Sequence, residues 1–84
     1  MNTPLREYDE VRVVKLNAVT RDFDGTDAVK RAPQVGDVAV ICHQYEPKDP
    51  HAAVAVEMVD KDGMTVWLAD FLPDELELIR RPTR

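Results

Sequence analysis

The sequence has few of the residues that reactive or cofactor-binding sites need. Its 84 residues include one cysteine, two histidines and three glycines. A single cysteine cannot form an internal disulfide, and a free thiol suits a reducing compartment. Three isolated glycines exclude a glycine-rich loop that cradles phosphates, and the paired spacing of zinc ligands is missing. We therefore expect neither a metal nor a cofactor.

Long hydrophobic runs are missing too. The longest stretch without a charged residue is Val38 to Tyr45, eight residues, whereas a membrane-spanning helix needs about 20. The first ten residues, MNTPLREYDE, show no basic segment before an apolar one, so no secretory signal is expected. The composition, 44% apolar and 32% charged, is typical of a globular domain. We expect one cytoplasmic domain over 1–84, with an ordered body over residues 8–81, and no membrane contact.

Negative charge is concentrated in the second half of the chain. Residues 1–34 hold six acids and six bases, whereas residues 35–79 hold ten acids against Lys48 and Lys61. Arg80, Arg81 and Arg84 follow at the end. Such a body repels phosphate backbones, which bind mainly through Lys and Arg, and it favours encounter with a basic partner. An acidic surface also serves solubility alone, and that alternative stays open.

Five segments have the composition or the two-residue alternation of strands. Asp62-Gly63 between two of them predicts a tight hairpin, because Gly63 can adopt positive φ. Pro73 opens a single helical turn before the last strand. Residues 46–51, EPKDPH, predict a turn, and residues 20–34 predict a long loop with a short helical turn over 27–31. The expected strands are Val11 to Val19, Val38 to Tyr45, Ala53 to Val59, Met64 to Leu72 and Leu76 to Arg80.

This order predicts a mainly β fold. Five short strands, a central meander and one helical turn before the last strand are typical of a small, strongly bent SH3-like barrel. An uncovered edge strand in such a sheet would allow a copy of the chain to pair with it.

Four motifs, in this order, resemble a family of small bacterial domains of unknown function, numbered 4926. The first two are Asp-x-Val-Arg at residues 9–12 and Gly-Asp at residues 36–37. The others are a strand ending in Asp-x-Asp-Gly, residues 56–63, and Leu-Pro-x-x-Leu, residues 72–76. The resemblance spans residues 8–80 and implies an SH3-like barrel without demonstrated chemistry. Similar small domains are sometimes found in toxin–antidote settings, which implies a binding role.

The patterns that could carry catalysis fail on geometry. Cys42 and His43 are neighbours in an expected strand, so their side chains point to opposite faces, and Cys42 is expected in the core. The acids from Asp22 to Asp27 do not match a calcium loop, because the glycine arrives too early. Asp74, Glu75 and Glu77 are expected as solvated charges, with Asp74 capping the turn. We expect no enzyme.

Trp67 has two interpretations. In a tightly bent barrel either strand face can be core, and burial is then expected for so large a ring. If Trp67 faces outward, it is an interface anchor that Tyr45 can join, within an acidic rim. The residues predicted to bind a partner are Trp67, Tyr45, Glu57, Asp60, Asp62, Asp70, Asp74 and Glu75.

Two classes of function remain. The first is a non-catalytic protein-binding module, of the immunity or antitoxin type, that covers a basic region of a toxin. The alternative is an SH3-like module associated with nucleic acid in transcription or translation, for which Val35-Gly36-Asp37 resembles the start. The charge disfavours that alternative, because only Lys30-Arg31 and the terminal arginines offer basic contacts.

Overall fold

The computed structural model describes residues 4–18 and 20–82 and shows a mainly β fold. Five antiparallel strands form a single sheet in the order β4-β3-β2-β1-β5. The strands and the one short 3-10 helix are β1 (Glu10–Val13), β2 (Val38–Gln44), β3 (Val54–Val59), β4 (Thr65–Phe71), η1 (Pro73–Glu75) and β5 (Leu76–Arg80).

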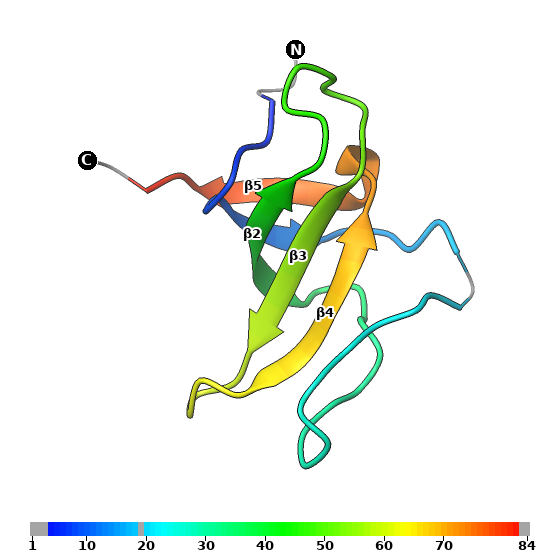
Figure 1. Ribbon diagram of the computed structural model, residues 1–84, viewed down its shortest axis with the longest axis vertical. Helices are drawn as coiled ribbons and strands as arrows, with labels where there is room; N and C mark the ends of the chain where they lie inside the picture. Colours follow the sequence, from blue (N-terminus) through cyan, green and yellow to red (C-terminus); the bar gives the residue numbers. More distant parts are fainter. Residues whose placement is uncertain (1–3, 19, 83–84) are drawn as a thin grey trace.

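The sheet bends sharply, so that β1 and β5 run across the ends of β2, β3 and β4 (Figure 1). Strands β4 and β5 are its two edges, and no pairing between them closes the sheet within the described residues. The expectation of five strands with one helical turn is confirmed, whereas a closed barrel is not seen. The bend nevertheless encloses a core on the concave side.

Alternation along the strands determines which side chains fill that core. Val11 and Val13 of β1, Ile41 of β2 and Val56 of β3 are fully buried. Trp67 is also fully buried, and its ring lies 5.3 Å from the ring of Phe71, centroid to centroid. The buried interpretation of Trp67 is therefore confirmed, and this side chain presents no surface to a partner. The remaining core members are Ala39, Val54, Val66, Ala69, Phe71 and Leu76.

The hairpin between β3 and β4 forms as its sequence predicts. Gly63 has φ of +82°, which an L side chain rarely adopts. The Asp60 N–H donates to the Met64 carbonyl at 2.9 Å, and the Asp60 carboxylate accepts the N–H groups of Asp62 and Met64. This local network ends both strands and turns the chain within four residues.

The first strand is shorter than expected. It ends at Val13 rather than at residue 19. The Val14 N–H donates to the carbonyl of Glu75 at 2.8 Å, so the chain leaves β2 and turns toward η1. The β-branched composition therefore predicted a strand that is longer than the part of it that pairs with neighbouring strands.

The long segment over residues 20–34 lies along the outer edge of β4. Asp24 and Leu68 exchange two backbone hydrogen bonds, at 3.0 and 2.8 Å, and the Arg31 N–H donates to the Val66 carbonyl at 3.2 Å. A Cβ on Gly25 would lie 2.7 Å from that same carbonyl oxygen, so only glycine permits this approach. Where a helical turn was expected over residues 27–31, a shorter hydrogen-bonded turn is present over residues 27–29, and the Lys30 N–H donates to the Thr26 carbonyl at 2.8 Å. The segment thus covers an edge that would otherwise expose unpaired backbone groups.

Three buried carboxylates hold the irregular segments to the sheet. They are Asp9, Asp37 and Glu75, none more than 8% exposed, and each pairs with an arginine. Asp37 accepts from both terminal nitrogens of Arg31 at 2.9 Å and from the Trp67 ring N–H at 2.9 Å. Burial alone would raise the pKa of Asp37, but these hydrogen bonds outweigh it and the pKa is lowered. The segment over residues 20–34 is therefore attached to the core through the Asp37 carboxylate, whose charge is fully hydrogen-bonded.

Glu75 is the second attachment and corrects an expectation. It was expected to be solvated, but it is 1% exposed and bonded to Arg21, with the N–H groups of Asn17 and Leu72 donating at 2.8 Å. Its carboxylate thus caps η1, the role expected of Asp74. Burial opposes ionisation of Glu75, yet these donors lower its pKa. The Arg21 guanidinium also lies 4.1 Å from the Phe71 ring centre.

Asp9 joins the two ends of the described chain. Arg81 donates to both of its carboxylate oxygens, at 2.9 and 2.8 Å, and the Arg6 N–H donates at 2.8 Å. Arg81 also donates to the Pro4 carbonyl at 2.7 Å. Burial opposes ionisation, but the bonds from Arg81 and Arg6 lower the pKa of Asp9. The residue after the last strand is therefore held against the segment before the first.

Candidate functional site

The convex face of β2, β3 and β4 carries side chains that the core does not use. On β3, Val54 and Val56 point inward, so Ala55 and Glu57 point outward. Strand pairing places Ala55 opposite Asp70 of β4. Residues of three strands therefore meet on one outer surface.

Cys42 lies on this surface and not in the core, where it was expected. The register of β2 against β3 shifts between Ile41 and His43, and Ile41 takes the inward position. Alternation from the buried Ala39 and Ile41 therefore points Cys42 outward as an exposed free thiol, whose Sγ donates to the Ala55 carbonyl at 3.4 Å. The preference of cysteine for burial was thus overridden by strand alternation, and the register shift turns His43 to the same outer face.

Tyr45 connects the end of β2 to β4. Its hydroxyl donates to the Asp70 carboxylate at 2.6 Å, and this bond raises the pKa of Tyr45. The ring also contacts His43 edge-on, with centroids 5.0 Å apart. Two of the residues predicted to bind a partner, Tyr45 and Asp70, are therefore in direct contact and solvent-exposed.

Carboxylates surround the thiol. Partial desolvation of the sulfur by its neighbours is the largest cause of the raised pKa of Cys42, and the nearby charges of Glu57, Asp70 and Glu7 raise it further. A thiol in such surroundings stays protonated at neutral pH and is a poor nucleophile, since catalytic cysteines need a cationic neighbour. The arrangement does not support covalent catalysis at Cys42.

The covering segment adds two more carboxylates at the edge of this surface. Phe23 packs against the core, and its neighbours Asp22 and Asp24 are exposed. Together with β2, β3 and β4 this segment bounds a shallow groove, lined among others by Asp22, Asp24, Cys42, Tyr45, Ala55, Leu68 and Asp70. We call the surface formed by Glu7, Asp22, Asp24, Glu57 and Asp70 the acidic face.

The charges of the acidic face are not neutralised by arginine or lysine within the described residues. Glu57 accepts from the Thr65 hydroxyl at 2.5 Å, and Glu7 lies 4.0 Å from Nδ1 of His43. Seven of the arginines and lysines are engaged elsewhere. Their ion pairs are Arg12–Glu77, Lys15–Asp74, Arg21–Glu75, Lys30–Asp27, Arg31–Asp37, Arg80–Glu10 and Arg81–Asp9.

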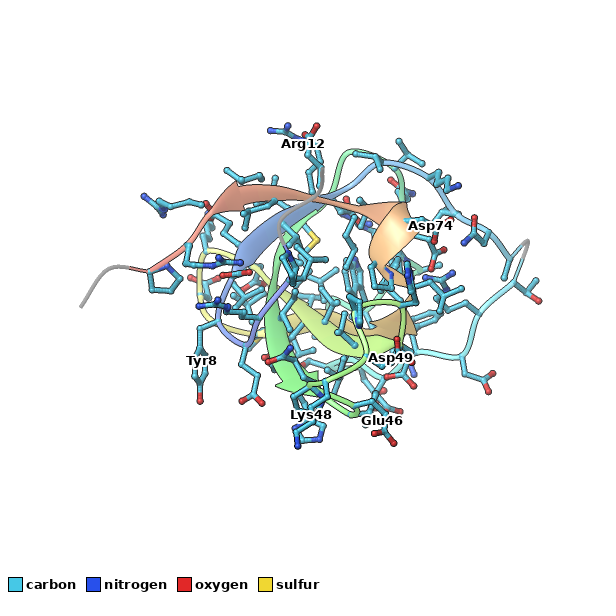
Figure 2. The ribbon with its side chains drawn as sticks, turned by 90° about the horizontal axis from the view of Figure 1, so that it is seen from above. Tyr8, Arg12, Glu46, Lys48, Asp49 and Asp74 are labelled. Atoms are coloured by element: carbon cyan, nitrogen blue, oxygen red, sulfur yellow. The ribbon has the colours of Figure 1, made fainter. Side chains whose placement is uncertain are left out.

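The other predicted partner-binding residues lie apart from the acidic face. Asp60 uses its carboxylate within the hairpin, and Asp62 sits at the hairpin tip. Asp74 projects from η1, where it pairs with Lys15 at 2.9 Å and accepts from Asn17 (Figure 2). Those bonds, the one with Lys15 foremost, lower the pKa of Asp74.

Sequence reasoning missed Glu7, Asp22 and Asp24. Asp22 and Asp24 were weighed only as calcium ligands, and no local pattern indicates that their segment pairs with β4. His43 was dismissed with Cys42 because strict alternation would separate the two side chains. The register shift in β2 places His43 on the outer face that alternation gives to Cys42, so both are exposed. No signal in the sequence would have located that register shift.

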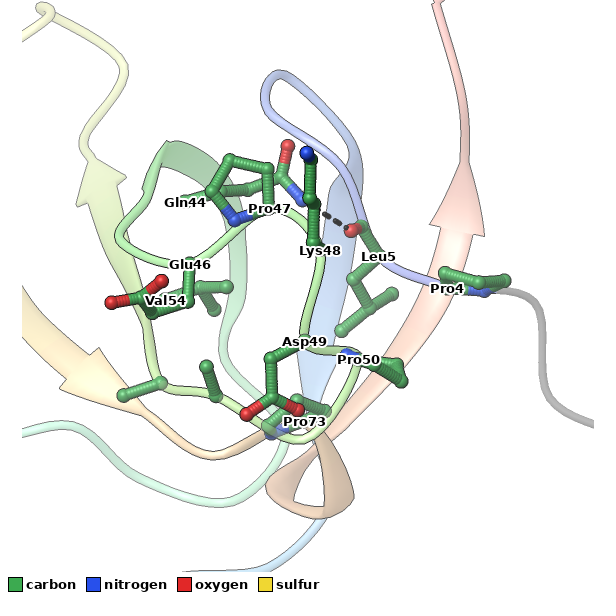
Figure 3. A pocket seen from close by; sticks show the side chains of 12 residues that line it. Pro4, Leu5, Gln44, Glu46, Pro47, Lys48, Asp49, Pro50, Val54 and Pro73 are labelled. Atoms are coloured by element: carbon green, nitrogen blue, oxygen red, sulfur yellow. Dashed lines mark hydrogen bonds between the residues drawn. The ribbon is translucent and has the colours of Figure 1, made fainter.

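A second hollow lies between the N-terminal segment and the loop after β2 (Figure 3). Gln44 donates to the Leu5 carbonyl at 3.0 Å across it. Its lining is mostly apolar, and the exposed Glu46 and Lys48 project from its loop on the side of the molecule opposite Arg12 (Figure 2). It brings together no set of unsatisfied polar groups, and we do not assign a site there.

Within residues 4–18 and 20–82 no cluster of three metal-ligating side chains is present. Over the same ranges, no helix has the length and apolar character needed to cross a membrane. Comparison with protein-family models, curated proteins and solved structures gave no significant match.

Proposed function

We propose that this chain is a non-catalytic protein-binding module that recognises a basic surface on another protein through the acidic face. The observation that carries the proposal is the separation of charge. Seven arginines and lysines are engaged with seven acids elsewhere, and none of them pairs with the acidic face in the described chain.

Uncompensated charge of one sign on a surface is suited to association. It accelerates encounter with a partner of opposite sign and disfavours partners of the same sign. Tyr45 adds an exposed aromatic ring, a residue type enriched at interfaces. A basic protein surface is complementary to both features, because its lysine or arginine side chains can lie opposite the carboxylates and pack against the Tyr45 ring.

The test uses two double variants of the full chain with the same change in net charge. Glu57→Gln/Asp70→Asn neutralises the acidic face, and Asp49→Asn/Asp62→Asn neutralises two exposed loop acids. Each protein is immobilised and used to capture partners from the source cells. We expect a basic protein on the wild type and on the loop variant, and its loss on the acidic-face variant.

Salt provides an independent measurement. Raising ionic strength from about 0.1 to 1 M shortens the screening length from about 10 to 3 Å, so the captured partner should elute. Equal retention by both double variants, or an acidic captured protein, would contradict the proposal. Tight binding of RNA or duplex DNA at low salt would favour the nucleic-acid alternative instead, although Arg6, Lys48 and Lys61 are the only described bases outside ion pairs.

We further propose an SH3-like barrel, a cytoplasmic location and membership of family 4926. The strand order, the sharp bend and the 3-10 turn before the last strand support the barrel (Figure 1).

A role in neutralising a basic toxin follows from the same acidic face and is tested by the identity of the captured protein. Self-association through β5 is a separate proposal, supported by its position as the edge opposite the covered one.

A further inference from the structure

The groove in the acidic face has a lining that is unlike the rest of that surface. Its floor includes two apolar side chains, Ala55 of β3 and Leu68 of β4, beside the thiol of Cys42 at β2. Ala55 has the smallest side chain that alternation places outward on β3, so the surface is hollowed there. A purely solvated acidic surface would not need an apolar floor.

The carboxylates of the groove come from its β4 side. Asp22 and Asp24 lie on the covering segment, and Asp70 lies on β4, the strand that pairs with this segment. Cys42 and Tyr45 line the β2 side. The hydroxyl of Tyr45 bonds one oxygen of Asp70, which holds both side chains in place. The backbone bonds between Asp24 and Leu68 hold the covering segment against β4.

We propose that this groove takes arginine side chains from an extended basic segment of a partner protein. A guanidinium is planar and weakly hydrated, so it lies against an apolar or aromatic surface while its N–H groups reach carboxylates. A lysine ammonium is compact and strongly hydrated, and it gains less from such a floor. This inference rests on the proposed function and adds the chemistry of the occupant.

The dimensions suit a segment and not a single amino acid. The groove crosses from the covering segment over β4 and β3 to β2, three strand spacings or about 14 Å. In an extended segment, side chains two residues apart point the same way and lie about 7 Å apart. One arginine of such a segment can reach the carboxylates of Asp22, Asp24 and Asp70 while the next lies over the β2 side of the groove.

Cys42 offers a direct readout, because it is the only cysteine and lines the groove. The probe is the peptide acetyl-Gly-Arg-Gly-Arg-Gly-amide, and the matched peptide has lysine in place of arginine. We expect the arginine peptide to slow alkylation of Cys42 by iodoacetamide and to shift the amide NMR signals of Ala55 and Leu68. The lysine peptide should bind several-fold more weakly.

Single substitutions locate the effect. Asp24→Asn and Asp70→Asn should each weaken binding of the arginine peptide about tenfold, the loss of one charge-assisted contact. Asp62→Asn, with the same charge change at the hairpin tip, should leave affinity within about twofold, because screening limits its influence. Equal binding of both peptides overturns the assignment to arginine.

Two results would show that the groove is not the binding site. One is unchanged reactivity of Cys42 at the highest soluble peptide concentration, and the other is an equal effect of all three substitutions on affinity. The same readout separates this inference from the proposed function. Suppose that Glu57→Gln/Asp70→Asn loses the captured basic protein, but that Cys42 stays fully reactive in the complex of this protein with the wild type. The acidic face then binds the partner, and the groove inference is wrong. If no basic protein is captured, the proposed function itself fails.

Discussion

Replacing Asp37 by asparagine tests whether the buried carboxylates hold the long loop to the sheet. The substitution preserves side-chain shape but removes the charge that faces Arg31, and it replaces one acceptor oxygen by a donor. Breaking a fully buried ion pair costs about 3–5 kcal/mol. The Arg31 side chain is 39% exposed, so solvent compensates part of the loss and we expect about 3 kcal/mol.

That loss is large for a chain of this size. At about 0.05–0.15 kcal/mol per residue, the whole domain has a free energy of unfolding of roughly 4–13 kcal/mol. Urea denaturation measures the change, and the fluorescence of Trp67 reports it, because this is the only tryptophan and it is fully buried. The midpoint should fall while the slope of free energy against urea stays constant.

Asp74→Asn is the matched control. It removes the same charge from an ion pair with Lys15 in which both side chains are more than half exposed. Exposed pairs contribute little to stability, so its midpoint should stay close to that of the wild type. A midpoint for Asp37→Asn equal to that of Asp74→Asn would refute the reasoning that burial makes the Asp37 pair essential.

Three further predictions concern other parts of the molecule. Gly25→Ala should destabilise by about 1–3 kcal/mol and speed hydrogen exchange of the Arg31 and Leu68 amides, which bond between the covering segment and β4, because the new Cβ would lie 2.7 Å from the Val66 carbonyl oxygen; unchanged exchange would argue against the close approach. The buried carboxylates have lowered pKa values, so their stabilisation is complete above the ordinary carboxyl pKa of about 4 and is lost as pH falls below it. Acid unfolding followed by circular dichroism should therefore begin below that pH, and unfolding that begins near neutrality would contradict the assignment. Cys42 should be alkylated more slowly at pH 7 than a small free thiol, and Asp70→Asn should accelerate the reaction, since a raised thiol pKa depends partly on that carboxylate.

Local chemistry determined much of the fold. The hairpin follows from Gly63, whose positive φ needs no help from distant residues, and Pro73 begins η1 as its fixed φ favours. Alternation and β-branched composition located the strands, and the last one has the expected limits, Leu76–Arg80. These features depend on residues within a few positions of one another, so a single sequence contains the information.

The site depended on contacts between distant residues. Glu75 was expected to be solvated because its sequence neighbours are charged, but Arg21, 54 positions away, makes its burial stable. The register shift in β2 brought His43 to the surface beside Cys42, and pairing of the Asp24 segment with β4 completed the groove.

The sequence by itself thus determined the strands, the turns and a net negative charge. Only the tertiary structure decided which carboxylates are neutralised and which remain for a partner. The reason is physical: an ion pair forms where two side chains meet in space, and in this chain most such pairs join residues that are far apart in sequence.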